Sequence, residues 1–174
     1  MAFTVADIKS NIWSYMDEAP KDSDLLTSVN EALLKLGDRA LVYAETEQVA
    51  EANAWYDLPA GLIGVEAVAT SDGSDYRNWR ARGGKISFMH SGTYKIVHTV
   101  LPARVTSISD TVQVHEAYQP AIIHYAAGWL KMQDDDESTD GKRLLAQAEV
   151  EFEQISRMLR RGRRSPNLTV KVER

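Results

Sequence analysis

Hydrophobic residues near the start of the chain recur every three or four positions, which is the spacing of one face of an α-helix. In this segment they are Val5, Ile8, Ile12 and Tyr15. Thr4 followed by Asp7 favours a helix start, because each side chain can accept a hydrogen bond from the other's backbone amide. Pro20 interrupts the pattern. We therefore expect a first helix from Thr4 to about Met16.

Helical spacing returns after this proline. The apolar positions of the second stripe are Leu26, Val29, Leu33, Leu36 and Ala40. Asp22 or Ser23 can cap the helix, since a short polar side chain at its start accepts a hydrogen bond from a free backbone amide. The pattern predicts a second helix that reaches to about Ala40.

The pattern changes between about Val49 and Gln113, where glycine, serine, aspartate and proline separate short segments rich in β-branched and aromatic residues. The candidate strands are Ala52–Asp57, Leu62–Thr70, Asn78–Ala81, Lys85–Met89 and Thr93–Val100. Gly83 and Gly84 favour a hairpin between two of them, because glycine adopts the positive φ angles of tight turns. We expect a small antiparallel sheet in this part of the chain.

Helical spacing is strongest in the last third of the chain. One stripe consists of Tyr118, Ile122, Tyr125, Trp129 and Met132, and the next of Leu145, Ala148, Phe152, Ile155 and Leu159. Pro120 suits the first turn of the earlier helix. Ser138 or Thr139 can cap the later one. We expect two long helices here, the last of which ends near Arg161.

These elements together predict an α+β fold that is mainly α, with a four-helix bundle-like core. A small antiparallel β insertion, at about residues 49–113, lies between the second and third helices. The helical domain extends over residues 1–161, and residues 162–174 form a basic, extended C-terminal arm.

The composition narrows the class of protein. The 174 residues are 44% hydrophobic and 26% charged, which is typical of a globular chain. There is no cysteine, so disulfides and thiolate-based sites are excluded. The first residues lack the basic and apolar regions of a signal peptide, and no run approaches the roughly 18 apolar residues of a membrane span. We expect neither secretion nor membrane insertion.

Charge is distributed unevenly along the chain. The net charge is −5, yet the segment from Lys142 to Arg174 carries nine basic and four acidic residues. The rest of the chain carries eleven basic and 21 acidic residues. Because an acidic body repels phosphates, the protein is not expected to wrap DNA non-specifically.

Candidate catalytic and metal sites are weak. The four histidines (His90, His98, His115 and His124) lack partners at metal-ligand spacing. The segment from His115 begins like a zinc-protease helix, but Gln119 stands where the second histidine is required. Asp136, Ser138 and Asp140 follow the spacing of a calcium loop, but Gln147 replaces the glutamate needed at its twelfth position. We predict no catalytic residue, no metal and no cofactor.

An enzyme whose site is assembled from scattered residues stays an alternative. Its candidates are His98, Glu66 and Asp110. Nothing in the sequence pairs a nucleophile with a base, so we predict that the protein is not an enzyme.

The basic cluster at the end of the last predicted helix admits three interpretations. Its members are Arg157, Arg160, Arg161, Arg163 and Arg164. They can form a solvated helix end favoured by the helix dipole, a contact with DNA phosphates, or a dock for an acidic protein partner. The arm that follows alternates Leu168, Val170 and Val172 with polar residues. It is either disordered or adds as a strand to the sheet of another chain.

Several segments resemble the head-to-tail adaptor, or connector, proteins of tailed bacteriophages. The segments are Ile8–Ile12, Asp24–Leu33, Trp55–Pro59, Gln119–Ala127 and Ala146–Phe152. The resemblance implies a helical protein whose subunits pack into a ring, dodecameric in such adaptors, beneath the capsid portal. The ring surrounds a tunnel through which DNA passes without sequence-specific binding.

This resemblance also implies partners and a location. The partners are further copies of the chain, the portal protein and a downstream tail or stopper protein, with no membrane. The location is the neck of the virion, and the bacterial host cytoplasm during assembly. The residues expected to contact the portal are Arg160, Arg161, Arg163, Arg164, Leu168, Val170 and Val172. The alternative function is a DNA-binding accessory or regulatory protein that uses the basic end of the last helix.

Overall fold

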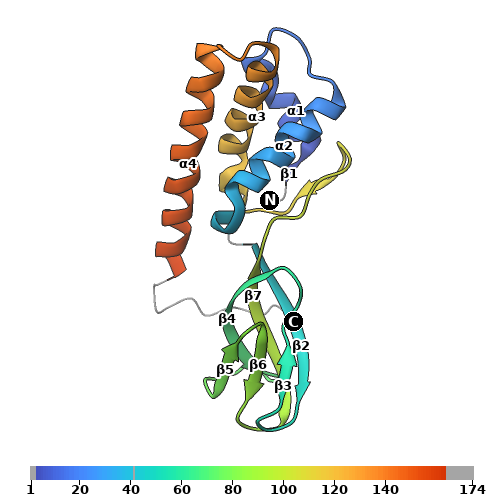
Figure 1. The fold of residues 1–174 in the computed structure, drawn as a ribbon, viewed down its shortest axis with the longest axis vertical. Helices are drawn as coiled ribbons and strands as arrows, with labels where there is room; N and C mark the ends of the chain where they lie inside the picture. Colours follow the sequence, from blue (N-terminus) through green and yellow to red (C-terminus); the bar gives the residue numbers. More distant parts are fainter. Residues whose placement is uncertain (1–2, 41, 164–174) are drawn as a thin grey trace. The chain divides into compact units, whose positions relative to one another are not determined.

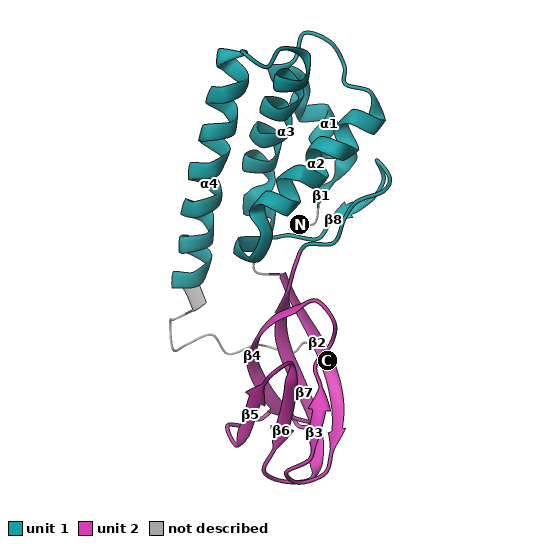
Figure 2. Ribbon diagram, viewed as in Figure 1, with its two compact units in different colours: residues 1–40, 102–174 teal, residues 41–101 magenta. Residues whose placement is uncertain are grey.

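The chain folds into two compact units in a computed structural model that describes residues 3–40 and 42–163. Residues 1–40 and 102–174 form unit 1, and residues 41–101 form unit 2 (Figure 2). Unit 2 is thus inserted in the sequence of unit 1.

Unit 1 is mainly helical (Figure 1). Its α-helices are α1 (Val5–Ile12), α2 (Asp22–Leu36), α3 (Gln119–Asp134) and α4 (Thr139–Arg163). Short 3-10 turns are η1 (Trp13–Tyr15), η2 (Gly37–Ala40) and η3 (Glu116–Tyr118). Two short strands, β1 (Phe3–Thr4) and β8 (Thr111–Val112), pair in antiparallel fashion. The helix ranges that the hydrophobic pattern predicts are confirmed to within a few residues.

Local side chains explain where these helices begin and end. The Thr4 hydroxyl accepts a hydrogen bond from the Asp7 backbone amide, and the Asp7 carboxylate accepts one from the Thr4 amide, as the sequence predicts. Ser138 caps α4 by accepting a hydrogen bond from Gly141 N. The predicted cap of α2 is wrong, because Asp22 is already its first helical residue. Asp22 lies in the first turn, where its charge favours the positive end of the helix dipole.

The core of unit 1 is built around α3, which packs against α1, α2 and α4. Each helix buries one apolar face, and the largest buried side chains include Ile8, Leu25, Leu36, Tyr118, Ile122, Leu144 and Phe152. Two predicted stripes differ at their first position: Leu25 is buried and Leu26 half-buried, and Leu144 is buried and Leu145 half-buried. The later positions that are buried as predicted are Val29, Leu33, Leu36, Ala40, Ala148 and Phe152. The difference arises because each helix has a wide apolar face, of which its packing partners cover one edge more fully.

A second set of contacts connects α4 to the end of α2. Glu149 of α4 forms ion pairs with Lys35 at 3.0 Å and with Arg39 at 3.4 Å. The Arg39 guanidinium also lies 5.8 Å from the centre of the Phe152 ring, within the range of a cation–π contact. The Tyr118 hydroxyl donates to the Arg39 carbonyl at 2.6 Å. Arg39 therefore connects α4, η2 and η3.

Helices α3 and α4 approach each other most closely at two glycines. A β-carbon at Gly128 would lie 2.9 Å from the Gly141 carbonyl oxygen and 2.9 Å from Leu145 N. A β-carbon at Gly141 would lie 3.0 Å from the side chain of Met132 and 3.1 Å from the Gly128 carbonyl oxygen. The contacts at Gly128 are mostly with backbone, which cannot rotate away, whereas those at Gly141 are mostly with side chains. Only glycine permits this helix separation.

In unit 2, the described residues 42–101 form six strands in two antiparallel sheets. The first sheet has the order β2 (Val42–Ala50), β7 (Gly92–Val100) and β4 (Leu62–Thr70), and the second has the order β3 (Trp55–Asp57), β6 (Lys85–Phe88) and β5 (Trp79–Arg82). β4 has the predicted bounds, and the other strands with a predicted counterpart shift by one to three residues. The sequence analysis missed β2, which pairs with β7 over nine residues.

The two sheets of unit 2 enclose a core of their own. It contains Ala50, Val68, Ile86, Phe88, Tyr94 and Ile96, all buried. The rings of Phe88 and Tyr94 stack in parallel with their centres 4.3 Å apart. Tyr76 packs against Tyr94 at 4.6 Å. Strands from both sheets contribute to this aromatic cluster, which makes unit 2 an independent hydrophobic unit.

The predicted fold class, a four-helix bundle-like core with a small β insertion, is wrong. The β residues form two sheets around a separate core, so they are a structural unit rather than an insertion in a bundle. Unit 1 has three longer helices, and its fourth, α1, comprises only eight residues. The prediction failed because β2 was not recognised, and without it the first sheet lacks an edge strand and half of its pairing.

We predict that Gly128→Ala destabilises unit 1 by about 2 kcal/mol, because the added methyl group forces α3 and α4 apart. Helix propensity alone has the opposite sign, favouring alanine by about 1 kcal/mol. Urea unfolding followed by circular dichroism measures the change in the free energy of unfolding. Ala146→Gly, at an exposed position of α4, is the control for propensity. A Gly128→Ala protein as stable as the parent would contradict the close approach.

Candidate functional site

The residues predicted to contact a portal lie at and beyond the end of α4. Arg160 and Arg161 are exposed in its last turns. Arg163 is the last residue of the helix, and its side chain is outside the description. Arg164, Leu168, Val170 and Val172 also lie outside the described residues.

The exposed arginines differ in their partners. Arg157 forms an ion pair with Glu153 at 2.9 Å, one helical turn earlier. Arg160 and Arg161 have no ion-pair partner among the described residues. Positive charge at the carboxyl end of a helix is favoured by the helix dipole. This explains why the cations are tolerated side by side and leaves their donors available to an acidic partner.

A polar cluster that the sequence analysis did not predict connects η1, α3 and α4. The Tyr15 hydroxyl lies 3.0 Å from His124 Nε2, and His124 Nδ1 lies 2.8 Å from a carboxylate oxygen of Glu151. Gln147 donates to the other carboxylate oxygen at 2.9 Å. The signal in the sequence is slight: Gln147 and Glu151 are one helical turn apart, and nothing relates either to His124.

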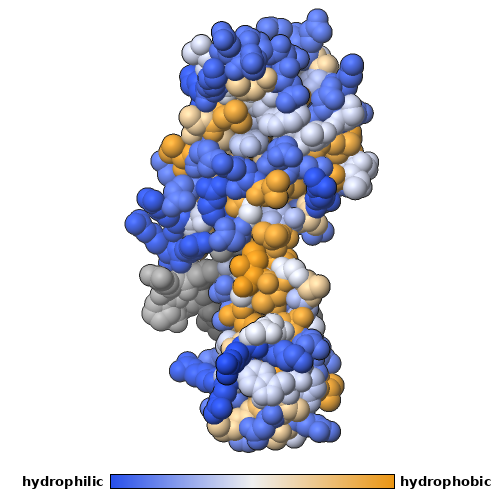
Figure 3. Space-filling view, viewed as in Figure 1, coloured by the Kyte–Doolittle hydropathy of each residue, from blue (hydrophilic) through white to orange (hydrophobic). Residues whose placement is uncertain are grey.

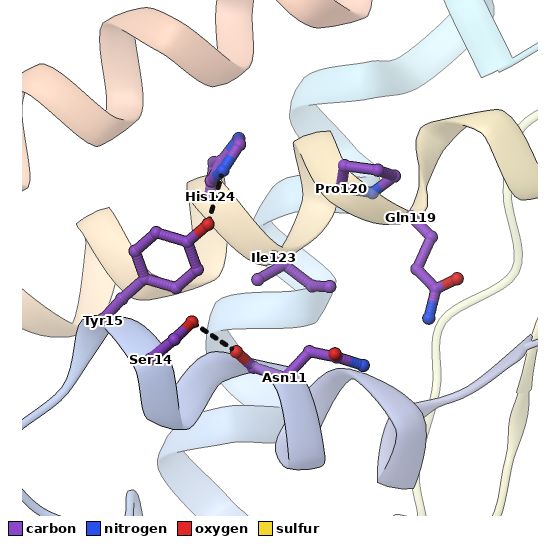
Figure 4. A pocket seen from close by; sticks show the side chains of 7 residues that line it. All are labelled: Asn11, Ser14, Tyr15, Gln119, Pro120, Ile123 and His124. Carbon is purple, nitrogen blue, oxygen red and sulfur yellow. Dashed lines mark hydrogen bonds between the residues drawn. The ribbon is translucent and has the colours of Figure 1, made fainter.

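A pocket of about 300 Å³ lies beside this cluster (Figure 4). Its lining residues are Asn11, Ser14, Tyr15, Gln119, Pro120, Ile123 and His124. The carboxylate orients the imidazole so that Nε2 faces the phenol, an arrangement that resembles a general-base relay. However, the nearby Ser14 hydroxyl donates to the Asn11 carbonyl at 3.0 Å. Both imidazole nitrogens of His124 already have hydrogen-bond partners, namely Tyr15 and Glu151. The cluster therefore satisfies its own polar groups and stabilises the packing of the helices.

The other three histidines have local partners. His90 Nδ1 lies 3.1 Å from the Tyr76 hydroxyl, and His98, which is buried, has Nδ1 3.2 Å from the Ile96 carbonyl oxygen. His115 Nδ1 accepts a hydrogen bond from the Ala117 amide. Within residues 3–40 and 42–163, no cluster of three or more histidine, aspartate or glutamate side chains could hold a metal ion.

The alternative enzyme site receives no geometric support. Glu66 is exposed on β4, and His98 is buried on β7. The Asp110 carboxylate accepts hydrogen bonds from Thr106 N at 2.7 Å and Ser107 N at 2.9 Å, which lower its pKa. The Asp110 carboxylate thus stabilises the loop of residues 106–110 through these hydrogen bonds.

The segment that follows the spacing of a calcium loop carries its own cations. Asp140 pairs with Arg143 at 2.7 Å and with Lys131 at 3.0 Å, and these contacts lower the pKa of its carboxyl group. The carboxylate is therefore neutralised by protein side chains rather than directed toward an ion.

Unit 2 carries a second candidate surface, which we call the Trp55 groove. It has a volume of about 400 Å³ and is lined by Asn53, Trp55, Arg77, Asn78, Trp79, Arg80, Ser87, Phe88 and Met89. No aspartate or glutamate is among the lining residues. The sequence analysis did not predict this groove, because its residues come from separate strands and turns.

Unit 1 thus carries exposed cations at the end of α4 and a polar cluster whose groups satisfy each other, and unit 2 carries a groove. The comparison with protein families gives the class directly. The model of the SU10 adaptor protein family matches residues 3–171, and the chain belongs to this family. The match agrees with the resemblance to phage head-to-tail adaptors and identifies a structural adaptor of a bacteriophage.

Two further comparisons bear on the chain. No curated protein sequence matches it. In the part of the chain that the structure describes, no helix combines the length and the apolar character that crossing a bilayer requires.

Tyr15→Phe should lower the free energy of unfolding by about 1 kcal/mol, because His124 Nε2 loses its partner in a half-buried site. Tyr125→Phe, on the same helix as His124 but without a hydrogen bond to the cluster among the described residues, provides a control for loss of a phenol. Thermal and urea unfolding of both variants measure the effect. Equal stability of Tyr15→Phe and the parent would show that the cluster does not stabilise unit 1.

The lowered pKa of Asp110 predicts a loss of stability in acid. Because the folded state favours the charged carboxylate, this stabilisation is complete above the unfolded pKa of about 4 and disappears as the pH falls through the lower folded value. Asp110→Asn should therefore flatten the decline in the urea midpoint below pH 4. The midpoints of both proteins from pH 6 to pH 2.5 measure it, and parallel curves would contradict it.

Proposed function

We propose that this protein forms a ring that joins the capsid portal to the tail and lets DNA pass. The observation that carries the proposal is the family match over nearly the whole chain. The ring is dodecameric, and its partners are the portal protein and a downstream tail or stopper protein. Its location is the virion neck, and the host cytoplasm during assembly.

The charge distribution supports passage of DNA. The chain before Lys142 carries 21 acidic and eleven basic residues. Phosphates are repelled by such a body, so a duplex slides past it instead of binding. Specific base contacts need donors and acceptors presented along a groove of DNA, which an acidic surface does not favour.

The end of α4 supports the portal contact. Arg160 and Arg161 are exposed and have no ion-pair partner among the described residues, so they can pair with acidic groups of another protein without breaking an internal contact. Arg163, Arg164, Leu168, Val170 and Val172 complete the proposed portal-binding segment. In this proposal the alternation of the arm adds a strand to a sheet of the partner, where backbone hydrogen bonds provide affinity.

The test is the mass of the protein in solution, alone and mixed with a purified portal ring. Full-length protein is compared with a chain that ends after Arg161. We expect the full-length chain to bind the portal as a ring, and the truncated chain to lose this binding. A monomer that ignores the portal and is retained by DNA, with steep salt dependence, would instead support the DNA-binding function.

A matched pair of double substitutions tests the arginines themselves. Arg160→Ala with Arg161→Ala should weaken portal binding about tenfold, or 1.4 kcal/mol. Lys142→Ala with Arg143→Ala removes the same charge at the opposite end of α4 and should leave binding unchanged. Surface-immobilised portal and a salt series measure both. Equal affinity of the two double variants would exclude the end of α4 from the portal contact.

A further inference from the structure

We propose that the Trp55 groove binds an acidic, extended peptide segment of a partner protein. The inference extends the proposed function, because it defines a second attachment surface on the adaptor. It rests on the geometry of one sheet of unit 2. The groove lies on the outer face of the sheet formed by β3, β6 and β5.

Strand register defines this face. Ser87 of β6 is paired with Trp55 of β3 on one side and with Arg80 of β5 on the other, so the three side chains form a row across the sheet. Their neighbours Ile86 and Phe88 point to the core of unit 2. Side chains alternate between the faces of a sheet, so the row faces outward.

The floor of the groove carries the hydroxyl of Ser87, a residue that is only 8% exposed. No described side-chain oxygen or nitrogen is both fully buried and without a hydrogen-bond partner, so this hydroxyl is not an orphaned buried group. It lines the groove, where a ligand can donate a hydrogen bond to it or accept one from it.

The walls combine apolar surface with positive charge. Trp55 and Met89 are each 48% exposed, which is unusual for side chains of this size and character. Arg77 is paired with Asp75 at 2.9 Å, whereas Arg80 has no ion-pair partner among the described residues. Four of the five basic residues of unit 2 lie in the short segment Arg77–Lys85, although the unit as a whole is acidic.

Figure 3 shows one face of unit 2, whose upper part in the view is covered mainly by hydrophobic residues and whose lower part is covered mainly by hydrophilic and intermediate ones. The lining of the groove itself is polar and cationic, with aromatic walls.

The combination of apolar and cationic side chains in the groove favours a particular class of ligand. Tryptophan, methionine and arginine are the side chains most enriched where proteins bind one another, and tryptophan with arginine dominates their binding energy. The arginine favours a carboxylate, and Trp55 with Met89 favours an apolar side chain beside it. Asn53 and Asn78 add amide donors and acceptors suited to a peptide backbone.

Duplex DNA fits the groove less well. A duplex presents phosphates to a protein surface, while its bases are stacked inside and unavailable to an indole ring. It could pair with Arg80 but would leave Trp55, Met89 and Ser87 without partners. Single-stranded DNA could stack on the indole, so it is the alternative that the test must distinguish.

The test uses fluorescence anisotropy of labelled probes with the full chain. The probes are a seven-residue peptide in which aspartate and glutamate alternate with leucine and phenylalanine, the same peptide with lysine and arginine in place of the acids, and a ten-nucleotide strand of deoxythymidine. We expect saturable binding of the acidic peptide alone. Arg80→Ser should weaken it about tenfold, because an arginine–carboxylate contact is lost.

Arg82→Ser is the matched control. Arg82 lies on the same strand, is exposed and carries the same charge, but it does not line the groove. It should leave the affinity for the peptide unchanged. Ser87→Val should weaken binding as well, and circular dichroism confirms that each variant is folded.

Several outcomes would overturn the proposal. They are absence of saturable binding by the acidic peptide, equal loss in Arg80→Ser and Arg82→Ser, and tighter binding of the deoxythymidine strand that Arg80→Ser abolishes. The last outcome would identify a site for single-stranded nucleic acid instead. Ring mass and portal binding of Arg80→Ser are measured in parallel, so that failure of the groove is distinguished from failure of the proposed function.

Discussion

The close approach of α3 and α4 at Gly128 and Gly141 is the constraint on which unit 1 depends. The two backbones meet at distances that exclude even a methyl group. Because α3 also packs against α1 and α2, its position fixes all the helices at once. The polar cluster of Tyr15, His124 and Glu151 spans the same helices and satisfies their polar groups. The contacts of Glu149 with Lys35 and Arg39 fix α4 to the end of α2 farther along the same helix.

Unit 2 is stabilised in a different way from unit 1. Its hydrophobic core lies between two small sheets and depends on stacked aromatic rings, chiefly Phe88 and Tyr94. Strand pairing then places Trp55, Ser87 and Arg80 in one row on the outer face. Such a row is held by three strands, so its geometry does not depend on a loop. A core on one face and a groove on the other give unit 2 a surface of its own.

The end of α4 and the Trp55 groove both carry positive charge, but in different chemical surroundings. At the end of α4, cations are favoured by the helix dipole and lie exposed beside one another. In the Trp55 groove, two arginines, of which Arg77 is paired with Asp75, lie among aromatic and amide side chains. The first arrangement favours a broad electrostatic contact, and the second favours a defined peptide. An adaptor needs attachments to more than one component, and chemically distinct surfaces keep those attachments from competing.

The sequence by itself determined the helices and most strands, because hydrophobic periodicity, capping residues and turn glycines act over a few neighbouring residues. The Thr4 and Asp7 cap and the bounds of β4 are examples. The adaptor class came from the resemblance of several segments to a known family, with which the family match agrees. The sequence analysis did not predict β2, because its strand character arises from pairing with β7 some fifty residues later. As a consequence, the predicted fold class was wrong. Only the tertiary structure brought His124 to Glu151 and Trp55 to Arg80. These pairs join residues far apart in the chain, and no local pattern records which distant side chains a helix face or a strand register brings together.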